Sequence, residues 1–103
     1  MSWRMVLGPD VENDVAEAAV WYEARQRGLG AAFVEEVITI WDELAINPLL
    51  NSRRYHPEKD IRWRLTNRFP YRVVYEVTES TQTVVVACVV HAARHDRHWR
   101  VRV

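Results

Sequence analysis

Arginine provides the side chains in this sequence that are best suited to binding or to chemistry. Thirteen of the fourteen basic residues are arginine, and the exception is Lys59. A guanidinium group binds phosphate or carboxylate through two parallel hydrogen bonds, whereas an ammonium group acts as a point charge. Arg62, Arg64 and Arg72 occur in two neighbouring segments with strand character, and Arg94 follows a third. These residues predict a surface that engages acidic macromolecules, with phosphate and carboxylate both open as the group bound.

Histidine is the side chain that usually supports general acid–base catalysis near neutral pH. His91, His95 and His98 are clustered at and after the end of the third strand-like segment, beside Arg94 and Arg97. Each of these histidines serves either in proton transfer or as a surface or hydrogen-bonded structural residue. Their spacing fits neither a firm catalytic pair nor a metal site.

No metal ion, cofactor or internal disulfide is expected. The single cysteine, Cys88, lies inside the apolar run 84–90, which predicts a small buried hydrophobic side chain. No His and Cys spacing fits a zinc site. Glycine occurs only at positions 8, 28 and 30, so the sequence has no glycine-rich phosphate loop.

Charge is distributed unevenly along the chain, although the formal net charge is zero. Residues 1–50 contain three basic and nine acidic side chains, whereas residues 51–103 contain eleven basic and five acidic ones. Two interpretations follow. The basic half binds an acidic partner, or the two halves pair with each other within the fold.

The first half of the chain predicts one strand and two helices within a single domain that covers residues 1–103. The strand runs from Trp3 to Leu7. Apolar side chains recur at helical spacing over 11–22, after a candidate N-cap at Asp10, and again over about 30–47, before Pro48. A short glycine-containing turn should join these helices into an antiparallel hairpin. Three aromatic residues are expected in or near the core: Trp21, Tyr22 and Trp41.

The second half predicts a three-stranded antiparallel meander, which makes the fold class α+β. The strands are expected at 61–66, 71–77 and 84–91. Alternation should turn Ile61, Trp63 and Leu65 toward the helices and Arg62 and Arg64 away from them. The third strand is apolar on both faces, so we expect it to be central, or to be covered on one face by another chain.

Arg72 is expected on the face opposite Tyr71, Val73, Tyr75 and Val77. The hairpin would then bring Arg72 beside Arg62 or Arg64 on an open cationic face. Arginines on such a face are either solvated and paired with nearby carboxylates or form a binding site. No stretch approaches the ~20 apolar residues that cross a bilayer, and the first residues contain no signal-peptide core, so we expect a cytoplasmic protein.

The sequence resembles the RelE/ParE superfamily of toxins from bacterial type II toxin–antitoxin modules, often labelled plasmid stabilisation proteins. The resemblance covers nearly the whole chain and rests on the order and spacing of several short segments: Trp21-Tyr22, Leu29-Gly30, Asn47-Pro48, Ile61-Arg62, Phe69 to Tyr75, Val89 to Arg94, and Trp99. It implies a β-α-α-β-β-β fold and a growth-inhibiting protein. It also implies a cognate antitoxin as partner in a hetero-oligomer.

Two branches of the superfamily imply different activities. RelE-like members cleave mRNA in the ribosomal A site with a cluster of cations around the scissile phosphate, to which Arg62, Arg64, Arg72 and Arg94 correspond. The RelE tail tyrosine that stacks on a base has no clear counterpart here, and Trp99 lies nearby. ParE-like members bind and poison DNA gyrase without nuclease activity.

The ParE-like branch is favoured. Three features support it: the Trp21-Tyr22 helix with its Leu-Gly turn, the Phe69-Pro70-Tyr71 turn, and the tail from His91 and Arg94 to Trp99. The alternatives are an mRNA endoribonuclease with a tail histidine in acid–base catalysis, and an inactive homologue that retains antitoxin binding.

Overall fold

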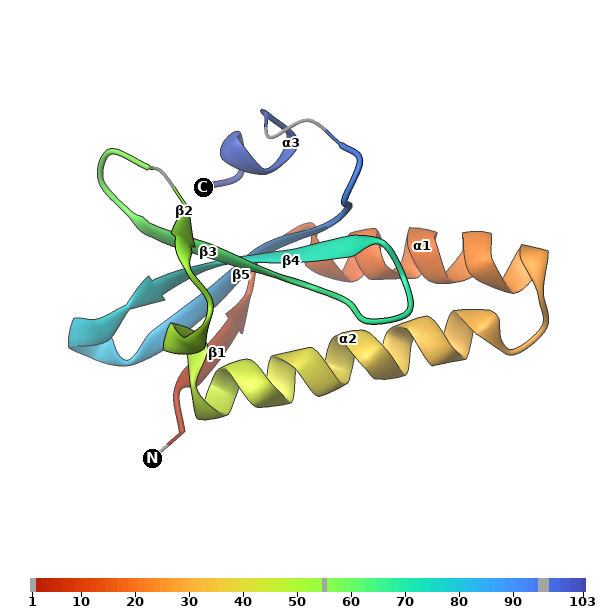
Figure 1. Cartoon of the computed structure of the whole chain (residues 1–103), viewed down its shortest axis with the longest axis horizontal. Coiled ribbons are helices and arrows are strands. Elements are labelled where there is room, and N and C mark those ends of the chain that lie inside the picture. The colour runs from red at the N-terminus through yellow and green to blue at the C-terminus, as the bar shows by residue number, and fades with distance from the viewer. Residues whose placement is uncertain (1, 55, 95–96) are drawn as a thin grey trace.

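The computed structural model describes residues 2–54, 56–94 and 97–103, with only the backbone described for residues 97 and 98 (Figure 1). The described elements follow the predicted order, with a short additional strand before the meander and a short helix after it. They are β1 (Arg4–Leu7), α1 (Val11–Arg25), α2 (Leu29–Ile46), β2 (Arg53–Arg54), β3 (Asp60–Leu65), β4 (Tyr71–Thr78), β5 (Thr83–His91) and α3 (Arg97–Arg100). The predicted α+β class, the helical hairpin and the meander are confirmed.

The five strands form one sheet in the order β1-β5-β4-β3-β2. β1 runs parallel to β5, and the other neighbouring strands are antiparallel. β1 ends where Gly8 donates its N–H to the carbonyl of Val86 at 2.7 Å. A Cβ atom on Gly8 would lie 2.9 Å from that same oxygen, so the close approach requires glycine. After Gly8 the chain leaves the sheet edge and enters α1.

The turn between the helices is held by one carboxylate. Glu23 accepts hydrogen bonds from the N–H groups of Gly28 at 2.9 Å and Gly30 at 3.0 Å. Its carboxylate thus satisfies backbone N–H groups at the start of α2 that have no acceptor within the helix. Gly28 has a φ of 88°, a left-handed conformation that favours glycine. Asp10 occupies the predicted N-cap position of α1, but its side chain makes no capping hydrogen bond.

The two long helices cover one face of the sheet, which we call the helix face. The buried side chains of this core come from α1, α2, β4 and β5, and include Val11, Val15, Phe33, Val37, Ile40, Leu44, Val73, Tyr75, Val77, Val84 and Val86. The predicted inward positions of β4 are therefore confirmed. Trp21 is not in this core, because 51% of it is exposed and its indole packs under the guanidinium of Arg25 at 3.8 Å.

The opposite face, which we call the tail face, is covered by residues 97–103 of the same chain. Figure 1 shows α3 on the side of the sheet away from α1 and α2. Trp99 closes a second core with Ile61, Val74 and Cys88, and Trp63, Val90 and Val103 pack around it. The expectation that Ile61, Trp63 and Leu65 face the helices was wrong. The pairing of Trp63 with Val74 and of Leu65 with Arg72 places them on the tail face.

A β-bulge in the β4–β5 ladder explains the continuous apolar run of β5. Val74 pairs with Cys88 and Tyr75 with Val86, so Ala87 is an extra residue in β5. Before the bulge Val84 and Val86 belong to the helix-face core, and after it Val89 does. β5 is an inner strand along Thr83 to Val86, where β1 and β4 flank it, and its second apolar face is covered by the chain's own tail.

Candidate functional site

Arg62, Arg64 and Arg72 do not gather on one face of the sheet. Arg62 pairs with Tyr75 and Arg64 with Val73, whereas Arg72 pairs with Leu65. Directly opposed residues of antiparallel strands share a face. Arg62 and Arg64 therefore lie on the helix face and Arg72 on the tail face, and the predicted open cationic face is not formed.

Arg62 is held entirely by groups of its own chain. Its Nε and Nη2 donate to the two carboxylate oxygens of Asp60 at 2.9 and 3.0 Å. Its Nη1 donates to the carbonyls of Leu49 at 2.9 Å and Asn51 at 2.7 Å. The hydrogen bonds to Asp60 raise the pKa of Arg62 above its ordinary value. This residue ties β3 to the segment that follows α2.

Arg64 forms an ion pair with Glu43 of α2. The pair joins a cation of the basic half to a carboxylate of the acidic half, as does the pair of Arg102 with Asp14 on α1. Part of the charge difference between the two halves of the chain is therefore neutralised by ion pairs within the fold.

Arg72 is 8% exposed and lies beneath the segment that follows β5. Its Nη2 donates to the carbonyls of Ala92 at 2.6 Å and Arg94 at 2.9 Å. Its guanidinium also lies 4.4 Å from the centroid of Trp63, and that of Arg54 lies 3.9 Å from the same ring. Arg72 therefore fixes the backbone after β5 and is not presented to a ligand.

Trp99, which lies near the position of the RelE tail tyrosine in the sequence, is buried and does not offer its ring to a base. It is 1% exposed and contacts Trp63 edge to face, with ring centroids 5.8 Å apart. Trp99 would have to leave the second core before it could stack on a nucleotide.

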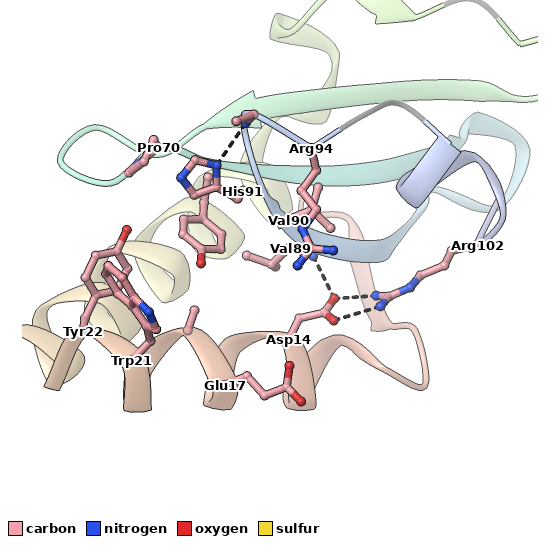
Figure 2. A pocket seen from close by; sticks show the side chains of 13 residues that line it. Asp14, Glu17, Trp21, Tyr22, Pro70, Val89, Val90, His91, Arg94 and Arg102 are labelled. Carbon is pink, nitrogen blue, oxygen red and sulfur yellow. Dashed lines mark hydrogen bonds and ion pairs between the residues drawn. The ribbon is translucent and has the colours of Figure 1, made fainter. Parts of the chain in front are cut away.

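His91 and Arg94 are brought together at an open groove of about 1020 Å³ between α1 and the end of β5 (Figure 2). His91 is partly buried; its Nδ1 accepts the N–H of Ala93 at 3.0 Å, and its ring contacts that of Tyr71. Arg94 is exposed and extends beside Val89 and Val90. His95 and the side chains of Arg97 and His98 lie outside the described residues.

The α1 side of the groove is aromatic, with Trp21 and Tyr22 beside Ala18 (Figure 2). Burial raises the pKa of Tyr22 and of Tyr71, and the positive charge of Arg94 opposes that shift at Tyr71. The phenols are therefore neutral hydrogen-bonding groups at physiological pH. Tyr22 packs against the helix-face core, as expected, whereas helical spacing alone does not reveal that Trp21 is half exposed.

Asp14 and Arg102 close one end of the groove. Asp14 accepts the N–H of Val89 at 3.0 Å, and its other oxygen accepts Nη2 of Arg102 at 2.9 Å. The hydrogen bond to Asp14 raises the pKa of Arg102. The sequence contained no signal for this contact, because the two residues are 88 positions apart.

Metal binding and thiol chemistry have little support in the part of the chain that the structure describes. No group of three His, Cys, Asp or Glu side chains there is placed to hold a metal ion. Burial raises the pKa of the Cys88 thiol to about 12, so it is not a thiolate at neutral pH. None of the described helices has the length and apolar character that a bilayer span requires.

The chain is similar in fold to several solved toxin structures. The isolated E. coli RelE toxin has a TM-score of 0.67 at 20% identity, covering 97% of this chain and 95% of its own. An E. coli RelE mutant in complex with a RelBc antitoxin peptide has a TM-score of 0.63 at 21% identity, covering 100% and 96%. The toxin from the Mycobacterium tuberculosis RelBE2 toxin–antitoxin complex has a TM-score of 0.62 at 15% identity, covering 88% and 99%.

At these identities the structural likeness establishes the fold alone. No curated protein sequence matches the chain significantly. Residues 6–96, however, match the sequence family described as the ParE toxin of the type II toxin–antitoxin system parDE. Because this match spans most of the sequence, the chain belongs to the ParE toxin family, within the RelE/ParE superfamily.

Proposed function

We propose that this toxin inhibits growth in the cytoplasm by binding and poisoning DNA gyrase, and that a cognate antitoxin neutralises it in a hetero-oligomeric complex. Its membership of the ParE family supports a target other than RNA, because the ParE-like branch acts by binding. The proposed activity is therefore inhibition by contact and needs no cofactor.

The separation of the strand arginines is the observation that carries this proposal. Cleavage of a phosphodiester requires cations that converge on the scissile phosphate. Arg62 and Arg64 lie on the helix face in contacts with Asp60 and Glu43, while Arg72 is buried on the tail face. Among the described side chains, these three cannot surround one phosphate without a rearrangement of the sheet.

The groove residues His91 and Arg94 are the proposed contacts with the target. Of the six residues expected at the site, these two line the open groove. Arg62, Arg64, Arg72 and Trp99 do not line this groove and make their contacts within the fold. Arg94 presents an exposed guanidinium in the same groove as the aromatic side chains of Trp21 and Tyr22, and arginine and aromatic residues are both enriched at protein–protein contact sites.

Parallel assays on the purified toxin and on cells test the proposal. We expect loss of gyrase supercoiling and trapped gyrase–DNA cleavage complexes, with no change in mRNA ends mapped by primer extension after expression without the antitoxin. Codon-positioned mRNA cuts would replace this proposal with the endoribonuclease. No effect in either assay, together with binding to an antitoxin encoded by an adjoining reading frame, would identify an inactive homologue.

A further inference from the structure

The two proposed contacts with the target, His91 and Arg94, lie at the two ends of a tight turn that begins at the last residue of β5. Ala92 donates its N–H to the carbonyl of Pro70 at 2.6 Å, and Ala93 donates its N–H to Nδ1 of His91 at 3.0 Å. Arg94 donates its N–H to the carbonyl of His91 at 3.0 Å. The N–H groups of the turn therefore find their acceptors within the turn or at Pro70.

Two carbonyl groups of the same turn are bonded from outside it. Nη2 of Arg72 donates to the carbonyl of Ala92 at 2.6 Å and to the carbonyl of Arg94 at 2.9 Å. Because these carbonyls lie two residues apart, a single nitrogen atom sets the distance between them. Arg72 is buried, so its removal would leave both carbonyls without this donor at a site with little access to water.

Trp63 orients the guanidinium of Arg72. The guanidinium carbon lies 4.4 Å from the centroid of the Trp63 ring, and Trp99 contacts the same ring edge to face. A guanidinium can stack its plane on an aromatic ring and still donate from its nitrogens, whereas the ammonium group of lysine has no plane to stack. The position is therefore suited to arginine and not to lysine.

We infer that Arg72 is a positioning residue for the binding of the target, and that it acts through the backbone of Arg94. By holding the carbonyl of Arg94, Arg72 fixes the point from which that side chain extends along the groove (Figure 2). Arg72 thus affects the inhibition of gyrase although it does not touch gyrase. The inference rests on the proposed function, because that function assigns Arg94 to the target contact.

β4 supports both proposed contacts through two consecutive residues. Tyr71 packs its ring against that of His91, with centroids 5.4 Å apart, and Arg72 bonds to the backbone of Arg94. Consecutive strand residues point to opposite faces of a sheet, so the turn is held from both faces. A site that is ordered before binding loses less conformational entropy when its partner binds. The loss of Arg72 should therefore weaken binding without removing an atom that contacts the target.

A double-mutant cycle on the full chain tests the inference, with gyrase inhibition compared at equal concentrations of folded protein. Arg72→Met keeps an unbranched side chain without donors and should weaken inhibition by about fivefold or more. The double variant should remain within about twofold of Arg94→Ala alone, because a residue that acts through Arg94 then has nothing left to position. Losses that multiply would show that Arg72 acts independently of Arg94 and would overturn the inference, as would full inhibition by Arg72→Met. Absence of inhibition by the unsubstituted chain would overturn the proposed function and the inference together.

Two further variants separate positioning from charge and from general stability. Arg72→Lys is the milder change for the same cycle, and we expect about threefold weaker inhibition, because lysine lacks the planar fork. Unchanged inhibition by Arg72→Lys would overturn the role of the fork. Arg62→Met is the matched control, since Arg62 also donates to two carbonyls but on the other face of the sheet. It should leave inhibition within about twofold, and a loss equal to that of Arg72→Met would overturn the inference.

Discussion

The helix face and the tail face of the sheet are closed by very different amounts of chain. Two helices of 15 and 18 residues cover the helix face, whereas the tail face depends on residues 97–103 and chiefly on Trp99. The helix-face core contains many interlocking side chains, so the loss of one leaves the others in place. On the tail face one aromatic residue closes the core. The tail face should therefore be the more sensitive to single substitutions.

The two faces also use arginine in different ways. On the helix face Arg62 and Arg64 are paired with carboxylates. On the tail face Arg72 binds carbonyls and stacks on Trp63. Arg94, beyond the end of β5, is exposed at the groove. Most of these arginines thus make contacts within the fold, whereas Arg94 is the proposed contact with the target, and the position of each residue along its strand decides which role it takes.

Trp99→Ala should have the largest effect on stability. Removal of a buried tryptophan leaves a cavity and costs about 3–5 kcal/mol of unfolding free energy. Urea denaturation followed by circular dichroism measures the loss. Trp21→Ala is the matched control, since Trp21 is 51% exposed and its removal should cost less than about 1 kcal/mol. Similar losses for the two variants would contradict the assigned importance of the tail.

Arg62→Ala should come next, because it removes the donor to two carbonyls and one of the two arginine partners of Asp60. We expect about 1–3 kcal/mol of destabilisation. Arg64→Ala, on the same face, removes a more exposed pair and should cost less than about 1 kcal/mol. Urea denaturation midpoints give both values if the dependence of the unfolding free energy on urea concentration is unchanged. A larger loss of stability for Arg64→Ala than for Arg62→Ala would contradict the proposed roles.

Arg102→Ala should weaken the packing of residues 97–103 against the sheet without removing a side chain from the second core. The bond to Asp14 is partly exposed, so we expect about 1–2 kcal/mol. Amides of α3 should exchange faster, while those at the centre of α2 should change only in proportion to global stability. If α2 and α3 were affected equally, the tail would not open separately from the helix face.

The burial of Cys88 in the second core should make the unfolding free energy depend on pH in the alkaline range, with no effect near neutrality. Its pKa is raised from 9.0 to about 12, so the unfolded chain loses this proton first as pH rises. Stability should therefore fall above pH 9, by about 1.4 kcal/mol at pH 10. Cys88→Ala should reduce this slope between pH 9 and 11. An unchanged slope, or rapid thiol labelling of the native protein at pH 8, would contradict burial of the thiol.

The longer elements could be predicted from the sequence, because periodicity and turn residues are local, whereas the short β2 and α3 were not predicted. The predicted helix at 30–47 and the strand at 71–77 lie close to α2 and β4. The facing of β3 could not be predicted, since alternation separates two faces without showing which one the helices cover. The apolar run of β5 indicated two covered faces, but nothing local identified Trp99 as the cover.

The candidate site was predictable only in part for the same reason. His91 and Arg94 lie near each other in the sequence and meet at the groove. Alternation alone predicts Arg62 and Arg72 on one face, because the register of the β3–β4 hairpin, which pairs Arg72 with Leu65, is not encoded in a local pattern. Asp14 and Arg102 meet only through the packing of the tail.

The central claim is that the toxin acts through the groove at Arg94 and not through the strand arginines. Gyrase inhibition by purified Arg94→Ala and Arg64→Ala, compared at equal concentrations of folded protein, tests it most directly. We predict that Arg94→Ala loses at least about tenfold in inhibition, as for a contact residue at an interface, while Arg64→Ala remains within about twofold of the unsubstituted chain. Full inhibition by Arg94→Ala together with loss in Arg64→Ala would contradict the account.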